Sequence, residues 1–230
     1  MRFRLPYFFF CAALFCCTAR GAFGADDLKS VLAKLDASAA QFHNTSADFV
    51  FDTEMTDPVP DTDIQKGTVY YQRTGDAFQM AAHIEQHNNR PASSTYAFAG
   101  GVLRFRDGDQ VHVYQASKWE SYLVLGFGAK GSDLTQKWDV KYVGPATIDG
   151  KKTQQLELVA KDPQVRKTIS KVTIWVDTER AVSLQQRFDE STGYRICKYT
   201  NFKVNGSLPS KAFDLKSSIK KPGHGEVASR

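Results

Sequence analysis

Residues 78–85 read FQMAAHIE, and this stretch decides the fold. Its apolar side chains recur at every second position, which is typical of a strand with one face against a core and the other in water. The apolar face would consist of Phe78, Met80, Ala82 and Ile84. This segment is the clearest strand in the chain.

The same period of two recurs on both sides of this strand. Pairs of residues with the turn chemistry of tight hairpins separate several segments, as at Asp107-Gly108, Asp149-Gly150 and Thr192-Gly193. About ten short strands joined by hairpins predict a mainly β (α+β) fold, with one large curled antiparallel sheet or unclosed barrel. The other strands are expected near residues 48–55, 68–72, 102–106, 110–115, 138–143, 153–160, 170–177, 182–189 and 194–202.

One amphipathic helix is expected before the sheet, because apolar residues there recur at helical spacing. Asp26 and Asp27 supply a cap and a favourable charge in its first turn. The apolar stripe consists of Leu28, Val31, Leu32, Leu35, Ala39 and Phe42.

Two segments break the alternation. Residues 87–94 are polar and contain Pro91, so we expect a loop there. Residues 122–134 are apolar but rich in glycine, which predicts one or two short helical turns over the mouth of the sheet. These turns would act either as a lid or as an ordinary connection that covers the core.

The N-terminus predicts export. Arg2 and Arg4 precede an apolar run too short to span a bilayer, and Ala22-Phe23-Gly24 fits the small-x-small rule of a signal peptidase site. We expect residues 1–24 to be a cleaved signal peptide, residues 25–219 to form a single domain in the periplasm, and residues 220–230 to be a disordered tail.

Removal of the signal changes the charge and the cysteine content. Three cations and three of the four cysteines leave with residues 1–24, so the net charge falls from +5 to 5 − 3 = +2 and Cys197 remains alone. A single cysteine forms no intramolecular disulfide, so the domain must rely on its core. Charges of both signs are interspersed, which gives no indication of a nucleic-acid partner.

The sequence contains none of the common catalytic motifs, and it predicts neither an enzyme nor a cofactor. His83, Glu85 and His87 would point the same way on a strand and could bind a metal. However, they occupy the face that alternation already assigns to water, so we predict no metal site. A packed residue is the preferred interpretation of Cys197.

One feature of the sequence does point to a function, namely the large apolar face of the first strands. A fully packed core and an apolar cavity would both explain it. In the second case the cavity would be lined by Phe49, Phe51, Tyr71, Phe78, Met80, Leu103 and Phe105.

The order of these features resembles the LolA family of periplasmic carriers of lipoproteins. The resemblance covers nearly the whole mature chain. It includes the helix that begins DDLKSVL, the strand ADFVF at residues 47–51, GTVYYQR at residues 67–73, RDGDQVHVY at residues 106–114, IWVD at residues 174–177, and residues 208–215.

The resemblance implies an unclosed barrel that binds acyl chains of lipoproteins and transfers them towards the outer membrane as a monomer. It also implies an inner-membrane release complex and an outer-membrane acceptor as partners. The arginine that bonds the lid in the empty family members falls on Arg73, and a nearby family aromatic falls on Phe78. An ordinary cation at the end of a strand is the alternative interpretation of Arg73.

Three hypotheses therefore remain open. The first is a carrier of lipoproteins, and the second is a periplasmic protein of the same fold that binds or senses another lipid or hydrophobic ligand. The third is an enzyme or a structural protein built on a similar sheet.

We predict that the mature protein begins near Ala25, because the cleavage pattern ends at Gly24. N-terminal sequencing of the exported protein would test this. A retained Met1, or a lipid on Cys16 or Cys17, would contradict it.

Overall fold

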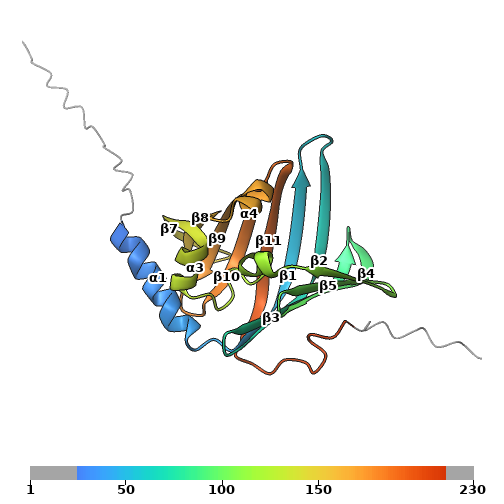
Figure 1. Ribbon diagram of the computed structural model, residues 1–230, viewed down its shortest axis with the longest axis horizontal. Coiled ribbons are helices and arrows are strands. Elements are labelled where there is room, and N and C mark those ends of the chain that lie inside the picture. The colour runs from blue at the N-terminus through green and yellow to red at the C-terminus, as the bar shows by residue number, and fades with distance from the viewer. Residues whose placement is uncertain (1–24, 216–230) are drawn as a thin grey trace, which may run out of the picture.

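A computed structural model of the chain describes residues 25–215. The expected signal peptide and the expected tail lie outside the described residues. One antiparallel sheet of eleven strands dominates the fold and does not close (Figure 1). Its first six strands are β1 (Asn44–Met55), β2 (Asp61–Thr74), β3 (Ala77–His87), β4 (Arg90–Ala99), β5 (Val102–Asp107) and β6 (Gln110–Gln115). The other five are β7 (Trp138–Ile148), β8 (Lys151–Ala160), β9 (Ile169–Asp177), β10 (Val182–Glu190) and β11 (Gly193–Val204).

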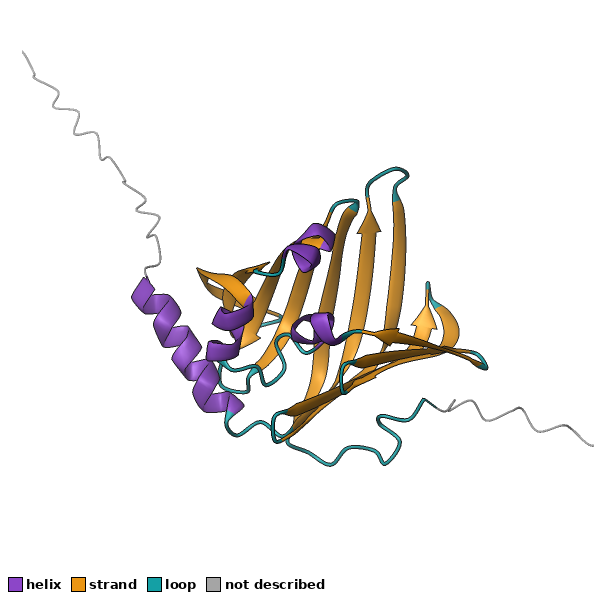
Figure 2. Ribbon diagram, viewed as in Figure 1, coloured by secondary structure: helices purple, strands orange, loops and turns teal. Residues whose placement is uncertain are grey.

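The two edge strands of the sheet, β6 and β7, do not pair with each other. The order of the strands is β6-β5-β4-β3-β2-β1-β11-β10-β9-β8-β7, so the two edge strands follow one another in the chain. The chain must therefore cross from one edge of the sheet to the other between residues 115 and 138. This connection contains η1 (Ser117–Trp119), α2 (Glu120–Leu123) and α3 (Gly131–Lys137). Figure 2 shows these turns in front of the curved sheet.

The expected fold class is confirmed, but the expected loop at residues 87–94 is wrong. A hairpin joins β3 to β4 there, and Asn88 and Asn89 form its turn with φ angles of 47° and 60°. Two successive residues of positive φ match the right-handed twist of paired strands, and asparagine tolerates this conformation well. Pro91 lies near the start of β4, opposite Gln86 and next to a shift in register.

The N-terminal helix is α1 (Ala25–Ala39), as the apolar spacing predicts. Val31, Leu35 and Ala39 are buried, and Phe42 is buried just after the helix ends. Helix α1 packs on α3 at a close approach, because a Cβ added to Gly131 would lie 2.5 Å from the carbonyl oxygen of Leu32. A further short helix, α4 (Pro163–Thr168), begins where the Asp162 carboxylate accepts hydrogen bonds from the amides of Gln164 and Val165. No helix within residues 25–215 is long and apolar enough to cross a membrane.

The connection between β6 and β7 is fixed to the sheet at its middle. Residues 125–128 are all buried. The amide of Ser183 donates to the carbonyl of Gly126, and the amide of Gly128 donates to the carbonyl of Ala181, each at 2.7 Å. Gly128 has a φ of 62°, and an added Cβ would lie 2.3 Å from the ring of Phe42. Only glycine suits this position.

Phe127 is the centre of this attachment, and we call residues 125–128 the anchor. Its side chain is fully buried. The ring stacks on Tyr71 of β2 with centroids 3.9 Å apart, and it meets Tyr199 of β11 edge-on at 4.9 Å. Both geometries are favourable for aromatic pairs. The anchor therefore fixes the crossing connection, of which it is a part, to the centre of the sheet.

We predict that Phe127→Ala lowers the free energy of unfolding by about 3–5 kcal/mol, because it leaves a cavity between two buried rings. Urea denaturation measures this loss. Val113→Ala on the exposed strand β6 is the control, with an expected change below about 0.5 kcal/mol. If both substitutions lower the free energy of unfolding by the same amount, the prediction that the anchor stabilises the fold is wrong.

Candidate functional site

A cavity of about 510 Å³ lies on the concave face of the sheet. Five strands from β1 to β5 form one side, β10 and β11 form the floor, and α2 covers it from above. Most of its wall is aromatic or aliphatic. The apolar side chains in the wall are Phe49, Phe51, Val69, Tyr71, Met80, Ala82, Ile84, Tyr96, Leu103, Tyr122, Leu123, Phe188, Cys197 and Tyr199.

Five of the seven residues predicted from the sequence lie together in this wall. They are Phe49, Phe51, Tyr71, Met80 and Leu103. Phe51 and Leu103 are only half-buried, so each has a surface available inside the cavity. No ligand is present, and their role in binding stays a prediction.

Phe78 and Phe105 do not line this cavity. Phe78 is buried, stacks on Phe42 with centroids 6.3 Å apart and faces a second hollow of about 430 Å³. Phe105 stacks on Tyr96 at 4.3 Å, near the edge of the sheet. Phe78 is absent from the cavity wall because the anchor covers the concave face at Tyr71 and separates the two hollows.

Six of the nineteen residues that line the cavity come from β10 and β11, whose contribution the sequence analysis did not identify. Gln186 and Phe188 of β10, and Arg195, Cys197 and Tyr199 of β11, all face inward. Part of the signal was present, because Phe188 lies between Arg187 and Asp189, and Tyr199 lies between Lys198 and Thr200. The sequence alone does not predict that β11 pairs with β1. This pairing places Tyr199 opposite Phe49 and Cys197 opposite Phe51.

The polar groups at the centre of the floor are uncharged. The hydroxyl of Tyr199 donates to the side-chain oxygen of Gln186 at 3.1 Å, and the amide nitrogen of Gln186 donates to the carbonyl of Leu125 in the anchor. Desolvation raises the pKa of Cys197 to about 12 and raises the pKa of Tyr71 and of Tyr199 above the ordinary value for tyrosine. All three groups are neutral near pH 7, so the floor suits an apolar ligand.

The roof of the cavity differs from the anchor that follows it. Residues 117–124, which we call the roof, are exposed or half-buried, whereas residues 125–128 are fully buried. Tyr122 of the roof packs on Phe188 with centroids 5.0 Å apart, and Trp119 meets Tyr122 edge-on at 6.1 Å. The two interpretations of the connection thus concern different parts of it, and the role of the roof as a lid stays a prediction. The anchor is a packed covering segment, and the roof has the lower burial that a movable lid needs.

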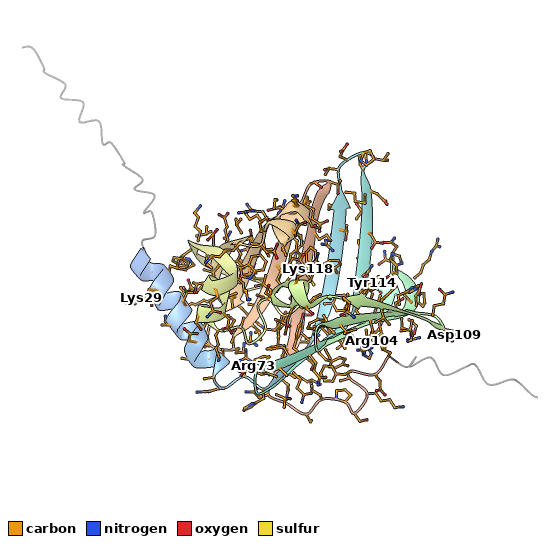
Figure 3. All side chains as sticks on the ribbon, viewed as in Figure 1. Lys29, Arg73, Arg104, Asp109, Tyr114 and Lys118 are labelled. Atoms are coloured by element: carbon orange, nitrogen blue, oxygen red, sulfur yellow. The ribbon has the colours of Figure 1, made fainter. Side chains whose placement is uncertain are left out.

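Arg73 lies where α1, β2 and the anchor meet (Figure 3). Its guanidinium donates to the carbonyl of Ala39 at 3.2 Å and to the carbonyl of Gly128 at 2.5 Å. It also lies over the ring of Phe78, 5.1 Å from the centroid. Desolvation lowers the pKa of Arg73 from its ordinary value, while the charge of Asp133 opposes this shift. Arg73 thus contacts the covering segment, and its role as a latch stays a prediction.

The histidines of β3 contact other partners. The imidazole Nε2 of His83 lies 2.8 Å from the carbonyl oxygen of Ala212, and His87 pairs with Asp63. Within residues 25–215, no group of three or more His, Cys, Asp or Glu side chains is arranged to hold a metal.

Comparison with solved structures identifies the fold. MucB aligns at 13% identity and a TM-score of 0.54, over 84% of this chain and 64% of MucB. The complex of MucA and MucB from Pseudomonas aeruginosa aligns at 13% identity and a TM-score of 0.50, over 83% of this chain and 61% of that one. The chain thus spans less than two thirds of the length of these relatives.

A LolA superfamily protein from Nitrosomonas europaea, NE2245, also aligns, at 15% identity and a TM-score of 0.41, over 81% of this chain and 96% of that one. The fold that the sequence resemblance implies, an unclosed sheet with an N-terminal helix and short covering helices, is the fold observed. No protein-family model matches the chain, and no curated protein matches it.

If Arg73 is a latch, its bonds to Ala39 and Gly128 stabilise the empty protein, and loading must break them. We predict that Arg73→Leu slows the release of a bound fluorescent fatty acid by roughly tenfold to a hundredfold, because each hydrogen bond to a charged group contributes about 1.5–3 kcal/mol. Stopped-flow measurement of the off-rate tests this.

Arg104→Leu is the matched control, since Arg104 is an exposed arginine of β5, away from Arg73 (Figure 3). Its off-rate should equal that of the wild type. If the off-rate of Arg73→Leu also agrees with the wild type within about a factor of two, Arg73 is an ordinary cation at the end of a strand.

Proposed function

We propose that this protein is a periplasmic carrier that holds acyl chains of lipoproteins in its concave cavity and transfers them towards the outer membrane. The observation that carries the proposal is the half-open apolar cavity under the roof. Five aromatic or aliphatic side chains of β1, β2, β3 and β5 would contact the chain. They are Phe49, Phe51, Tyr71, Met80 and Leu103.

The cavity has the size and chemistry that such a ligand needs. Sites for small molecules usually have volumes of about 300 to 1,000 Å³ and mostly apolar walls. A cavity of about 510 Å³ lies inside this range. The neutral groups at the centre of its floor, such as Cys197 and Tyr199, offer an acyl chain no charge to desolvate.

The affinity expected from this cavity suits a carrier. Each buried methylene contributes roughly 0.8 kcal/mol, so about ten buried methylenes contribute roughly 8 kcal/mol, from which the entropic cost of association is subtracted. Complete burial of several long chains would exceed the practical limit of non-covalent affinity. A cavity that encloses its ligand only in part therefore binds firmly and still releases.

A second candidate is a binding or sensing protein that holds a different hydrophobic ligand and docks on a protein partner. The aligned complex of MucA and MucB favours it, because that complex joins a protein of this fold to another polypeptide. The LolA resemblance instead implies a release complex at the inner membrane and an acceptor at the outer membrane. Both candidates need the same cavity, and they differ in what it carries.

Mass spectrometry of organic extracts of the purified protein tests these proposals. An acylated lipoprotein supports the carrier, and a free lipid supports the second candidate. We predict that Leu103→Glu reduces the co-purified material at least tenfold, because it places a carboxylate against the acyl chain.

Val113→Glu on the exposed edge strand β6 is the matched control and should retain the wild-type amount. If neither an acylated protein nor a lipid co-purifies with the wild type, and no fatty-acid probe binds to it, the proposed function is wrong.

A further inference from the structure

Two charged side chains stand in the wall of a cavity that is otherwise neutral. Glu190 ends β10 and Arg195 lies near the start of β11, and both face the cavity. Among the described residues that line it, no other carries a charge near pH 7. The guanidinium Nη2 of Arg195 forms an ion pair with the Glu190 carboxylate. One end of the apolar cavity is therefore polar.

The guanidinium of Arg195 lies among apolar groups. It sits over the rings of Phe51, at 5.6 Å from the centroid, and of Phe188, at 6.0 Å. Its Nη2 also lies 3.5 Å from the hydroxyl of Tyr122 in the roof. The side chain of Arg195 is 29% exposed, so its charge is shielded from water in part, and its attraction for an anion is stronger there than at a fully exposed site.

Arg195 still has a hydrogen bond to offer. Its Nε is buried and has no hydrogen-bond acceptor within the part of the chain that the structure describes. A buried donor without an acceptor is destabilising, so an acceptor brought by a ligand would improve the site. Guanidinium groups bind carboxylates and phosphates through two parallel N–H donors, and Nε takes part in such pairs.

We propose that Arg195 is the head-group site of this cavity and binds the anionic head of an amphiphile whose acyl chain lies against Phe51 and Leu103. This inference rests on the proposed function, since it needs an acyl chain in the cavity. The head group is a carboxylate or a phosphate, which share the chemistry that Arg195 recognises. Glu190 holds the guanidinium while the cavity is empty and competes with the incoming anion.

The position of Tyr122 connects this site to the roof. Its ring covers Phe188, and its hydroxyl contacts the same guanidinium. Desolvation raises the pKa of Tyr122 above its ordinary value, so the hydroxyl keeps its proton near pH 7 and can donate to an anion. An anionic head bound to Arg195 would thus also hold the roof closed.

Displacement of the neutral dye N-phenyl-1-naphthylamine by three ligands of equal chain length, dodecanol, dodecanoate and dodecyl phosphate, tests the proposal at about pH 8, where fatty acids in solution are ionised. The wild type should bind at least one of the two anions roughly tenfold to a hundredfold more tightly than dodecanol. The anion that binds more tightly identifies the source as a fatty acid or a phospholipid.

Arg195→Met should abolish this preference, so that dodecanol and the two anions bind with similar affinities. Glu190→Gln should increase the affinity for the preferred anion, because it removes the competing carboxylate. If Arg195→Met fails to fold because Glu190 is left unpaired, the double variant R195M/E190Q supplies the same test. Arg187→Met is the matched control, since Arg187 is another arginine of the β10–β11 hairpin but does not line the cavity.

Equal affinities of the wild type for dodecanol and both anions would overturn the proposal, as would a preference that survives in both Arg195 variants. A lower affinity of Glu190→Gln for the anions would also overturn it, because Glu190 would then assist binding rather than compete. If the dye and all three ligands fail to bind to the wild type, the proposed function itself is wrong.

Discussion

The stack of Phe127 on Tyr71 is the contact on which the rest of the structure depends. A sheet with β6 and β7 at its two edges needs a connection across its concave face, and that connection must bury its own apolar side chains. Phe127 does so at the centre of the sheet, between Tyr71 and Tyr199. Gln186 and Arg73 then bond the carbonyls on either side of it, at Leu125 and Gly128. The crossing connection therefore covers the core of a sheet whose two edges remain unpaired.

This attachment also determines where a ligand can lie. It fills the concave face at Tyr71 and leaves one apolar cavity on the side of Phe51 and a second, more highly charged hollow on the side of Phe78. The anchor starts where the roof ends, and only the roof, residues 117–124, has the lower burial that a movable segment needs. Arg73 contacts the anchor rather than the roof, and any latch would act on the roof through the anchor.

The sequence predicts the parts of the structure that depend on local patterns. The helix stripe ending near Ala39 and the alternation around Phe78 predict elements that the structure contains. The hairpin at Asn88 and Asn89 was missed because a polar segment with a proline outweighed a turn signal of two asparagines. Alternation predicts which face Phe78 occupies, but only the distant contact of Phe127 with Tyr71 separates it from the cavity. Arg195 went unnoticed for the same reason, since its neighbours come from β1, β10 and the roof.

Photo-crosslinking with a fatty acid that carries a diazirine at the end of its chain tests the central claim most directly, because it reports where the acyl chain lies. The account predicts that mass spectrometry finds the label on side chains of the cavity wall, such as Phe49, Met80 and Leu123. An excess of unlabelled fatty acid should remove this label. Labelling confined to the hollow around Phe78 and Trp138, or to the outer surface of the sheet, would contradict the account.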